Sequence, residues 1–174
     1  MKNILLIVVL NSLFLQGCDG EMEQNGELVS NLAPHLILQD GCNGMTYEGE
    51  LYSGKYVKYY GDDGYGDVKA QGSYKDGVMD GLWEYYYENG QLYSKGTFLN
   101  GEFEGAWEYN YENGQLLSKG SYQNGEKDGV WEEFNYINGK LSTWGSYLKG
   151  KQNGVWKYYN KDGDLIKEIN FSFE

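Results

Sequence analysis

A repeat of 24 residues constrains the fold of this chain more than any other feature of its sequence. Trp83, Trp107 and Trp131 lie 24 residues apart, and Trp156 follows after 25. Glycines and leucines keep the same spacing, at Gly72, Gly96, Gly120 and Gly145 and at Leu92, Leu116, Leu141 and Leu165. A period of this length is typical of stacked supersecondary units rather than of a single core around a cleft. The repeat therefore favours a binding or scaffold protein over an enzyme.

Each repeat reads as a β-hairpin. In residues 81–97 an aromatic run is followed by Asn89-Gly90 and then by a second strand-like run. Asn-Gly between two such runs predicts a type I′ turn, in which both turn residues adopt positive φ. The dipeptides Asp-Gly and Asn-Gly recur along the chain, at Asp76-Gly77, Asn89-Gly90, Asn100-Gly101, Asn113-Gly114, Asn124-Gly125, Asn138-Gly139 and Asp162-Gly163. Because each repeat holds two turns, the chain is expected to be an antiparallel meander.

The positions of the turns fix the expected register. Counting outward from a two-residue loop at Asn89-Gly90 gives the pairs Glu88–Gln91, Tyr87–Leu92, Tyr85–Ser94, Glu84–Lys95 and Trp83–Gly96. The same count gives Glu108–Lys119 and Trp107–Gly120 in the next hairpin, and Lys157–Glu168 in the last. Opposite charges on facing positions stabilise a sheet by roughly 0.2–1 kcal/mol per pair. The charge pairs therefore support this register.

Each tryptophan is expected to cover the glycine that faces it in its own hairpin, because a bare glycine weakens a strand unless a large ring lies over it. In the last hairpin Trp156 faces Ile169, which fits a C-terminal cap. The third repeat has one extra residue before Gly139: a β-bulge there would place Trp131 opposite Gly145, and a lengthened turn would give this hairpin a different register. Strand alternation predicts two faces, one with Trp83, Tyr85, Tyr87, Leu92 and Phe98, and the other with Glu84, Tyr86, Glu88, Tyr93 and Lys95.

The repeats resemble the bacterial MORN-repeat-variant family. The phrase G-x-[YF]-x-x-G-x-x-x-G-x-W runs from Gly96 to Trp107, and residues 47–55 resemble the core of the eukaryotic MORN unit with Leu51 in place of tryptophan. The choline-binding cell-wall repeat is a rival resemblance, but its period is shorter. The family resemblance covers about residues 45–171. It implies an all-β fold, an elongated single-layer antiparallel β-hairpin repeat array with a groove, and many bacterial members are labelled antitoxins (YwqK-like).

The chain divides into a leader, a linker and the repeats. Residues 1–17 read as a signal peptide, with Lys2 before an apolar run. The sequence from Leu15 to Cys18 resembles a bacterial lipobox, which would make Cys18 an acylated residue; an ordinary cleaved signal is the alternative. Residues 18–44 are then an acidic tether and linker, and residues 45–174 hold a degenerate first unit, 47–71, and the units 72–95, 96–119, 120–144 and 145–171. The expected location is the bacterial cell envelope, lipid-anchored, in the periplasm or on the cell surface. If Cys18 carries lipid, Cys42 has no disulfide partner.

The net charge of the chain limits the kinds of molecule that it is expected to bind. The chain has 14 basic and 26 acidic residues, a formal net charge of −12, and no arginine. Nucleic-acid binding is disfavoured, because phosphate contacts depend on positive charge and especially on arginine. Anionic lipid head groups are disfavoured for the same reason. The acidic surface suits a basic protein partner, or it serves only to keep the protein soluble.

The residues that usually carry catalysis are few. His35 is the one histidine, so the usual triads and histidine-rich metal sites are excluded. Asp62, Asp63 and Asp67 lie among glycines, but their spacing is not that of a calcium-binding EF-hand, and a plain turn is favoured. We expect no enzyme activity, no metal and no cofactor.

The aromatic stripe is the candidate site. It comprises Trp83, Trp107, Trp131 and Trp156, with Tyr85 and Tyr109 beside them. One interpretation is structural, since a thin sheet has to bury its own aromatic side chains. The other is a groove for a partner helix, an extended peptide or a glycan. The expected function is a membrane-anchored protein–protein interaction module, in the leading version the partner of a basic toxin; the alternatives are a glycan or cell-wall binder and a structural surface lipoprotein.

Overall fold

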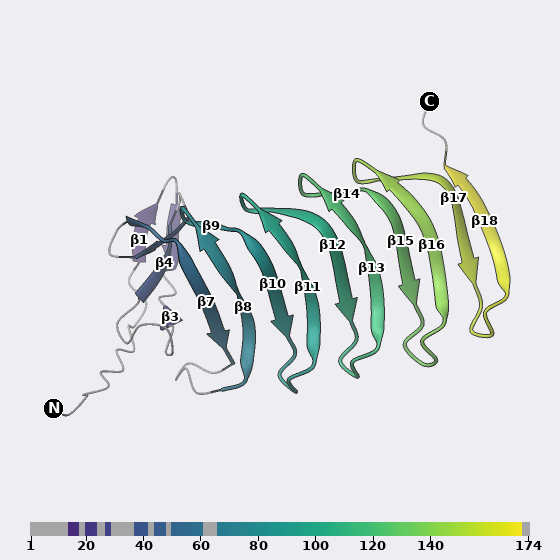
Figure 1. The fold of residues 1–174 in the computed structure, drawn as a ribbon, viewed down its shortest axis with the longest axis horizontal. Coiled ribbons are helices and arrows are strands. Elements are labelled where there is room, and N and C mark those ends of the chain that lie inside the picture. Colours follow the sequence, from purple (N-terminus) through teal and green to yellow (C-terminus); the bar gives the residue numbers. More distant parts are fainter. Residues whose placement is uncertain are drawn as a thin grey trace.

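The computed structural model describes residues 14–17, 20–23, 27–28, 37–41, 44–47, 50–60 and 66–171. All regular structure in these residues is β (Figure 1). The main sheet is an open meander of 12 strands, in the order β18-β17-β16-β15-β13-β12-β11-β10-β8-β7 with β9 and β14 paired beside β8 and β13. The expectation of an all-β antiparallel hairpin array is confirmed.

The strands of the main sheet follow the repeats. They are β7 (Gly54–Tyr59), β8 (Val68–Lys75), β9 (Val78–Met79), β10 (Gly81–Tyr86), β11 (Leu92–Leu99), β12 (Glu102–Asn110), β13 (Leu116–Gln123), β14 (Glu126–Lys127), β15 (Gly129–Phe134), β16 (Leu141–Leu148), β17 (Lys151–Tyr159) and β18 (Leu165–Phe171). Two small sheets precede it: β1 (Phe14–Gly17) with β2 (Gly20–Glu23), and β3 (Glu27–Leu28), β4 (Ile37–Gly41), β5 (Gly44–Tyr47) and β6 (Glu50–Leu51). These short strands fall within the segments expected to be leader, linker and first unit.

The two ends of the hairpins use different turns. At one end both turn residues have positive φ, as the type I′ turn requires, at Asp76-Gly77, Asn100-Gly101, Asn124-Gly125 and Lys149-Gly150. At the other end the prediction of a type I′ turn at Asn89-Gly90 was wrong. There only Gly90 has positive φ, and the Tyr87 N–H donates to the Gln91 carbonyl at 2.8 Å around a three-residue loop. The Asn89 side chain accepts from the Gln91 N–H at 2.9 Å, which stabilises this three-residue loop.

A register shift between Tyr85 and Tyr86 compensates for the longer loop. Trp83 therefore faces Gly96 and Glu84 faces Lys95 as predicted, but Leu92 faces Tyr86 instead of Tyr87. Facing residues share a side of the sheet, so Leu92 lies on the face opposite to the one expected. Tyr93 also changes face, because its ring contacts Tyr87 and Tyr109, at 5.1 and 6.4 Å between ring centroids.

The third repeat keeps its predicted register. Trp131 faces Gly145, and the register shift between Glu133 and Phe134 is the one that the regular hairpins also have, so the extra residue lies in the loop. The Asn135 N–H donates to the Lys140 carbonyl at 2.8 Å, so this loop has one residue more than the loop after Tyr87. The longer loop exposes Tyr136 and Ile137 to solvent, at 53% and 85%.

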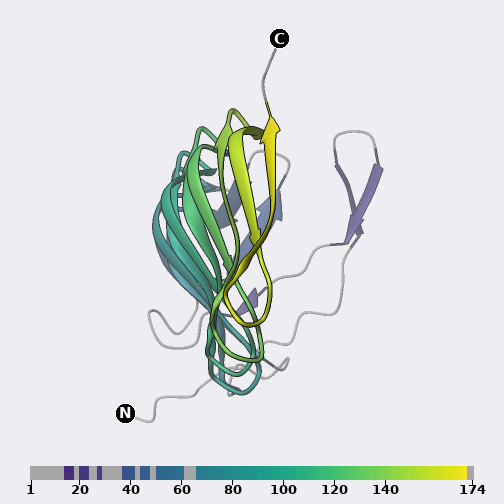
Figure 2. The same ribbon diagram turned by 90° about the vertical axis from the view of Figure 1, so that its right-hand side faces the viewer.

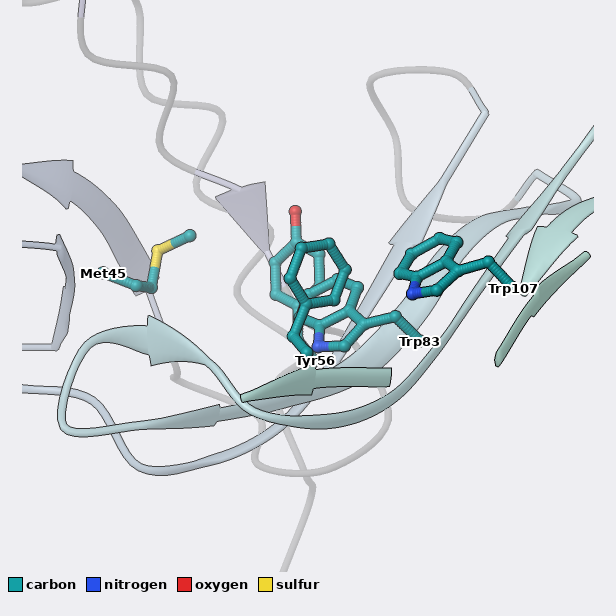
Figure 3. Packing of buried hydrophobic residues seen from close by; sticks show 5 residues of the cluster. Met45, Tyr56, Trp83 and Trp107 are labelled. Atoms are coloured by element: carbon teal, nitrogen blue, oxygen red, sulfur yellow. The ribbon is translucent and has the colours of Figure 1, made fainter. Parts of the chain in front are cut away.

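Tryptophan and glycine alternate in a row that crosses the whole sheet. From β7 to β18 the row reads Tyr56, Gly72, Trp83, Gly96, Trp107, Gly120, Trp131, Gly145, Trp156 and Ile169. Tyr56, Trp83 and Trp107 lie along one line in Figure 3, and Met45 of β5 lies at the end of that line. These residues belong to one buried cluster with Phe98.

Each indole covers the glycine on the second strand of the preceding hairpin. A methyl group at Gly96 would overlap the indole of Trp107, and one at Gly72 would overlap that of Trp83. The expectation that Trp83 covers Gly96 within one hairpin was therefore wrong. Each indole N–H also donates to a carbonyl of the preceding hairpin, as in the bond from Trp107 Nε1 to the Thr97 carbonyl of β11 at 3.2 Å. Ile169 fits this arrangement, because no strand in the described part of the chain follows β18 to place a ring over it.

The strand bends where the glycine of the G-x-W phrase stands. Gly105 has a φ of 66°, and the register between β11 and β12 shifts there, so that Gly96 faces Trp107 while Thr97 faces Glu104. The equivalent glycines Gly81, Gly129 and Gly154 also have positive φ. A residue with a side chain would be strained in this conformation. The bend lets Phe98 and Phe103 pack on Trp107, at 5.3 and 4.5 Å between ring centroids.

Hydrogen bonds join each repeat to the next at both ends of the hairpins. At the type I′ turns, Gly101 N–H donates to the Met79 carbonyl and Gly125 N–H to the Phe103 carbonyl, at 2.8 and 2.9 Å. At the opposite end, the Tyr87 hydroxyl donates to the Asn110 carbonyl at 2.9 Å. Neighbouring repeats are thus held in one relative position along the array, which Figure 2 shows from its β18 end.

The face opposite the tryptophans carries a ladder of alternating charge. Across the strands it reads Gln71, Glu84, Lys95, Glu108, Lys119, Glu132, Trp144, Lys157 and Glu168. Its ion pairs are Lys95–Glu108 at 3.3 Å, Lys119–Glu132 at 3.0 Å and Lys157–Glu168 at 3.7 Å. The predicted partners do face each other, but Lys95 and Lys119 contact the glutamate of the following strand. Trp144 interrupts the alternation, and in the hairpin after it the charges are inverted, with Lys157 facing Glu168.

Candidate functional site

The predicted aromatic stripe forms the core of the array. Trp83, Trp107, Trp131 and Trp156 are only 2–3% exposed. Each donates its indole N–H to a backbone carbonyl, at 3.0–3.2 Å. The indoles therefore offer almost no surface on which a glycan or a peptide could stack.

Tyr85 and Tyr109 lie beside the indoles, as expected. Each ring stacks on the tryptophan two residues before it, Trp83 or Trp107, with centroids 6.0 Å apart and an interplanar angle of 25°. Burial raises the pKa of Tyr85 to about 12. Burial also raises the pKa of Tyr109, as does its hydrogen bond to the Tyr122 hydroxyl at 3.0 Å. Both phenols are thus neutral across the physiological range of pH and serve packing.

The third repeat places charge on this aromatic face. Lys127 occupies the position held by Phe103 one repeat earlier, and its Nζ lies 3.9 Å from the centroid of the Trp131 ring. Burial lowers the pKa of Lys127, and the carboxylate of Glu133 opposes this shift. The attraction of the ammonium to the indole partly offsets the cost of its burial. The pairing of Lys127 with Trp131 was not predicted from the sequence. The signal was that Lys127 occupies the repeat position of Met79 and Phe103, where the two preceding repeats have an apolar side chain.

The type I′ turns gather acidic side chains at one end of the hairpins. Three successive turns carry them, and we call this set the acidic turn edge: Asp76, Asp80, Glu102, Glu104, Glu126 and Asp128. Asp80, Glu104 and Asp128 accept a backbone N–H of the next turn, for example from Asn124 to Glu104 Oε2 at 3.0 Å. Glu102 and Glu126 are exposed. The signal was visible in the sequence, since an acid precedes the glycine of three G-x-W phrases.

Several expected features lie outside the described residues: Cys18, Cys42, His35, Asp62 and Asp63. Asp67 is described and is exposed. Within the described part of the chain, no group of three or more histidine, cysteine, aspartate or glutamate side chains is arranged to hold a metal ion. The same residues contain no helix with the length and apolar character needed to cross a membrane.

Comparison with known protein families finds the MORN repeat variant over residues 79–100, 103–124 and 152–172. These segments include the bent strands, the tryptophans and the loops at Asn89-Gly90, Asn113-Gly114 and Asp162-Gly163, whereas the type I′ turns lie at or beyond their ends. The third repeat, with its longer loop and Lys127, falls between the matches. Comparison with curated proteins finds no match. The three segments support a MORN-repeat family for this chain, and such repeats are consistent with a non-catalytic interaction module.

Proposed function

We propose that this protein is a non-catalytic, membrane-anchored module that binds a basic protein partner. The observation that carries the proposal is the burial of the tryptophan row. Because the indoles are buried inside the array, recognition falls to the exposed surface, where carboxylates stand beside scattered apolar residues such as Leu82 and Val130. That surface belongs to a chain with a net charge of −12 whose basic residues are all lysines.

The acidic turn edge is the part of this surface best suited to a basic partner. Its carboxylates repeat with the hairpins, at intervals of about 10 Å for two strands per repeat. The hydrogen bonds between successive turns hold these intervals fixed. A row of like charges at fixed spacing attracts a complementary surface and speeds its association.

A toxin is the first partner to test, because many members of the family that the repeats resemble are labelled antitoxins. An anchored protein fits an immunity-like role outside the inner membrane better than the neutralisation of a cytoplasmic toxin. A glycan ligand finds less support, since aromatic stacking would have to use the partly buried tyrosines instead of the indoles.

Charge reversal on the acidic turn edge tests the proposal. Crosslinking pull-downs from native envelopes would compare the unchanged protein with the pair Glu102→Lys and Glu126→Lys. We expect one stoichiometric protein whose capture falls at least about tenfold in this variant and at high salt. The matched control is Glu88→Lys with Glu112→Lys, the same change of charge on exposed residues of the opposite turns, which should keep the partner. Equal loss in both variants, or retention on cell-wall polysaccharide alone, would contradict the proposal.

The anchor has its own test. Cys18→Ala is expected to move the protein from the membrane fraction to the soluble fraction of cells, because the acyl chain supplies the attachment. Metabolic labelling with a fatty acid should mark the unchanged protein and not the variant. A variant that stays in the membrane fraction without label would show that Cys18 is not the anchor.

A further inference from the structure

The two ends of the hairpin array differ in the contacts that their terminal residues make. At the N-terminal end, the β5 segment docks on the first type I′ turn, where the Met45 N–H donates to the Gly77 carbonyl at 2.7 Å and the Gly77 N–H donates to the Tyr52 carbonyl at 2.9 Å. The Met45 side chain is buried in the aromatic cluster. The β5 segment therefore covers the first turn and the start of the aromatic cluster at this end.

The last hairpin lacks the groups that reach toward a following repeat. Asn153 stands where Asp80, Glu104 and Asp128 accept a bond from the next turn. Asn160 stands where Tyr87 donates forward, and, like Asn135 in the third repeat, its side chain accepts from its own turn, here from the N–H groups of Asp162 and Asp164 at 2.9 Å. Ile169 takes the place of the glycine that a following indole would cover. The array is thus not built to receive another unit of its own kind.

Strand β18 nevertheless leaves an open sheet edge. In the described part of the chain it pairs only with β17, and it is the strand nearest the viewer in Figure 2. Tyr158 faces Lys167 and Tyr159 faces Leu165, so Ile166 is bulged, and the regular part of the strand is residues 167–171. Leu165 and Ile166 are 48% and 65% exposed. An edge of this kind presents unpaired backbone groups to any strand that can align with it.

We propose that β18 pairs with the β18 of a second copy, antiparallel, in a register centred on Ile169. Two identical strands related by a two-fold axis must place residues of the same face opposite each other. Centring the pair on Lys167 or Glu168 would oppose two like charges, which is destabilising. Centring it on Ile169 opposes Lys167 to Phe171 and Glu168 to Asn170, and it uses all five regular residues. It also joins the two tryptophan rows through the two Ile169 side chains.

Disulfide trapping tests both the pairing and its register. The purified full chain would carry Cys18→Ser and Cys42→Ser, so that one engineered thiol is left. Ile169→Cys is expected to form a covalent dimer, because strand pairing brings the two Cα atoms within the range of a disulfide. The control is Val155→Cys, an exposed position on β17. We expect dimerisation at least about tenfold faster at position 169, since pairing raises the effective concentration of the thiols.

A second measurement covers the case in which the Ile169 variant folds poorly. Glu168→Cys and Asn170→Cys occupy exposed positions, and a mixture of the two proteins should crosslink to each other faster than either does to itself. Faster self-crosslinking of Glu168→Cys would mean a register centred on Glu168 and would overturn the proposal. Rates no higher than that of Val155→Cys in both experiments would overturn it too, and would leave the edge to a strand of another protein.

Discussion

Trp107→Ala is expected to lower the free energy of unfolding by about 3–5 kcal/mol, the cost of truncating a buried tryptophan. Trp107 is 2% exposed and touches Phe98 and Phe103. It also covers Gly96 of the preceding hairpin. The cavity therefore opens between two repeats, where the array depends on contacts with neighbours. Urea unfolding followed by circular dichroism measures the loss.

The control for this variant is Trp144→Ala. Trp144 lies on the charge-ladder face, is only partly buried, and contacts Lys157, whose Nζ is 5.7 Å from its ring. We expect its loss to be no more than half that of Trp107→Ala. Equal losses would mean that the tryptophan row has no special part in stability.

Gly96→Ala is expected to cost about 1–3 kcal/mol or more, the range for overpacking a closely packed interior. The added methyl group would overlap the indole of Trp107. That ring cannot move freely, because its Nε1–H is bonded to the Thr97 carbonyl. The neighbouring change Thr97→Ala, at an exposed position, should alter stability by less than about 0.5 kcal/mol. A Gly96→Ala protein as stable as the Thr97→Ala protein would refute this packing.

Much of the fold could be predicted because turn dipeptides and a fixed period determine the register together. The pairs Trp83–Gly96 and Lys157–Glu168 follow from counting alone, and both are present. The turn at Asn89-Gly90 could not be predicted in this way. Its conformation depends on whether the Asn89 side chain bonds the backbone two residues later, and the same dipeptide forms a type I′ turn at Asn100-Gly101.

The direction in which the indoles lean could not be read from an interior repeat, because Trp107 has a glycine on both sides, Gly96 and Gly120. Only the end of the array breaks this symmetry. Ile169 follows Trp156 and has no later tryptophan to cover it, so it needs no glycine. The burial of the tryptophans depends on the bend in the strand at Gly105 and at the equivalent glycines. These glycines have positive φ, and the amino-acid composition of the strand does not predict that conformation.

The central claim is that each indole covers the glycine of the hairpin before it, and a pair of double-mutant cycles tests it most directly. Gly96→Ala would be combined with Trp107→Leu in one cycle and with Trp83→Leu in the other, with leucine used to keep the variants folded. We predict a coupling energy above about 1 kcal/mol with Trp107, because removing that indole makes room for the methyl group, and below about 0.5 kcal/mol with Trp83. Strong coupling of Gly96 to Trp83 and weak coupling to Trp107 would contradict the account.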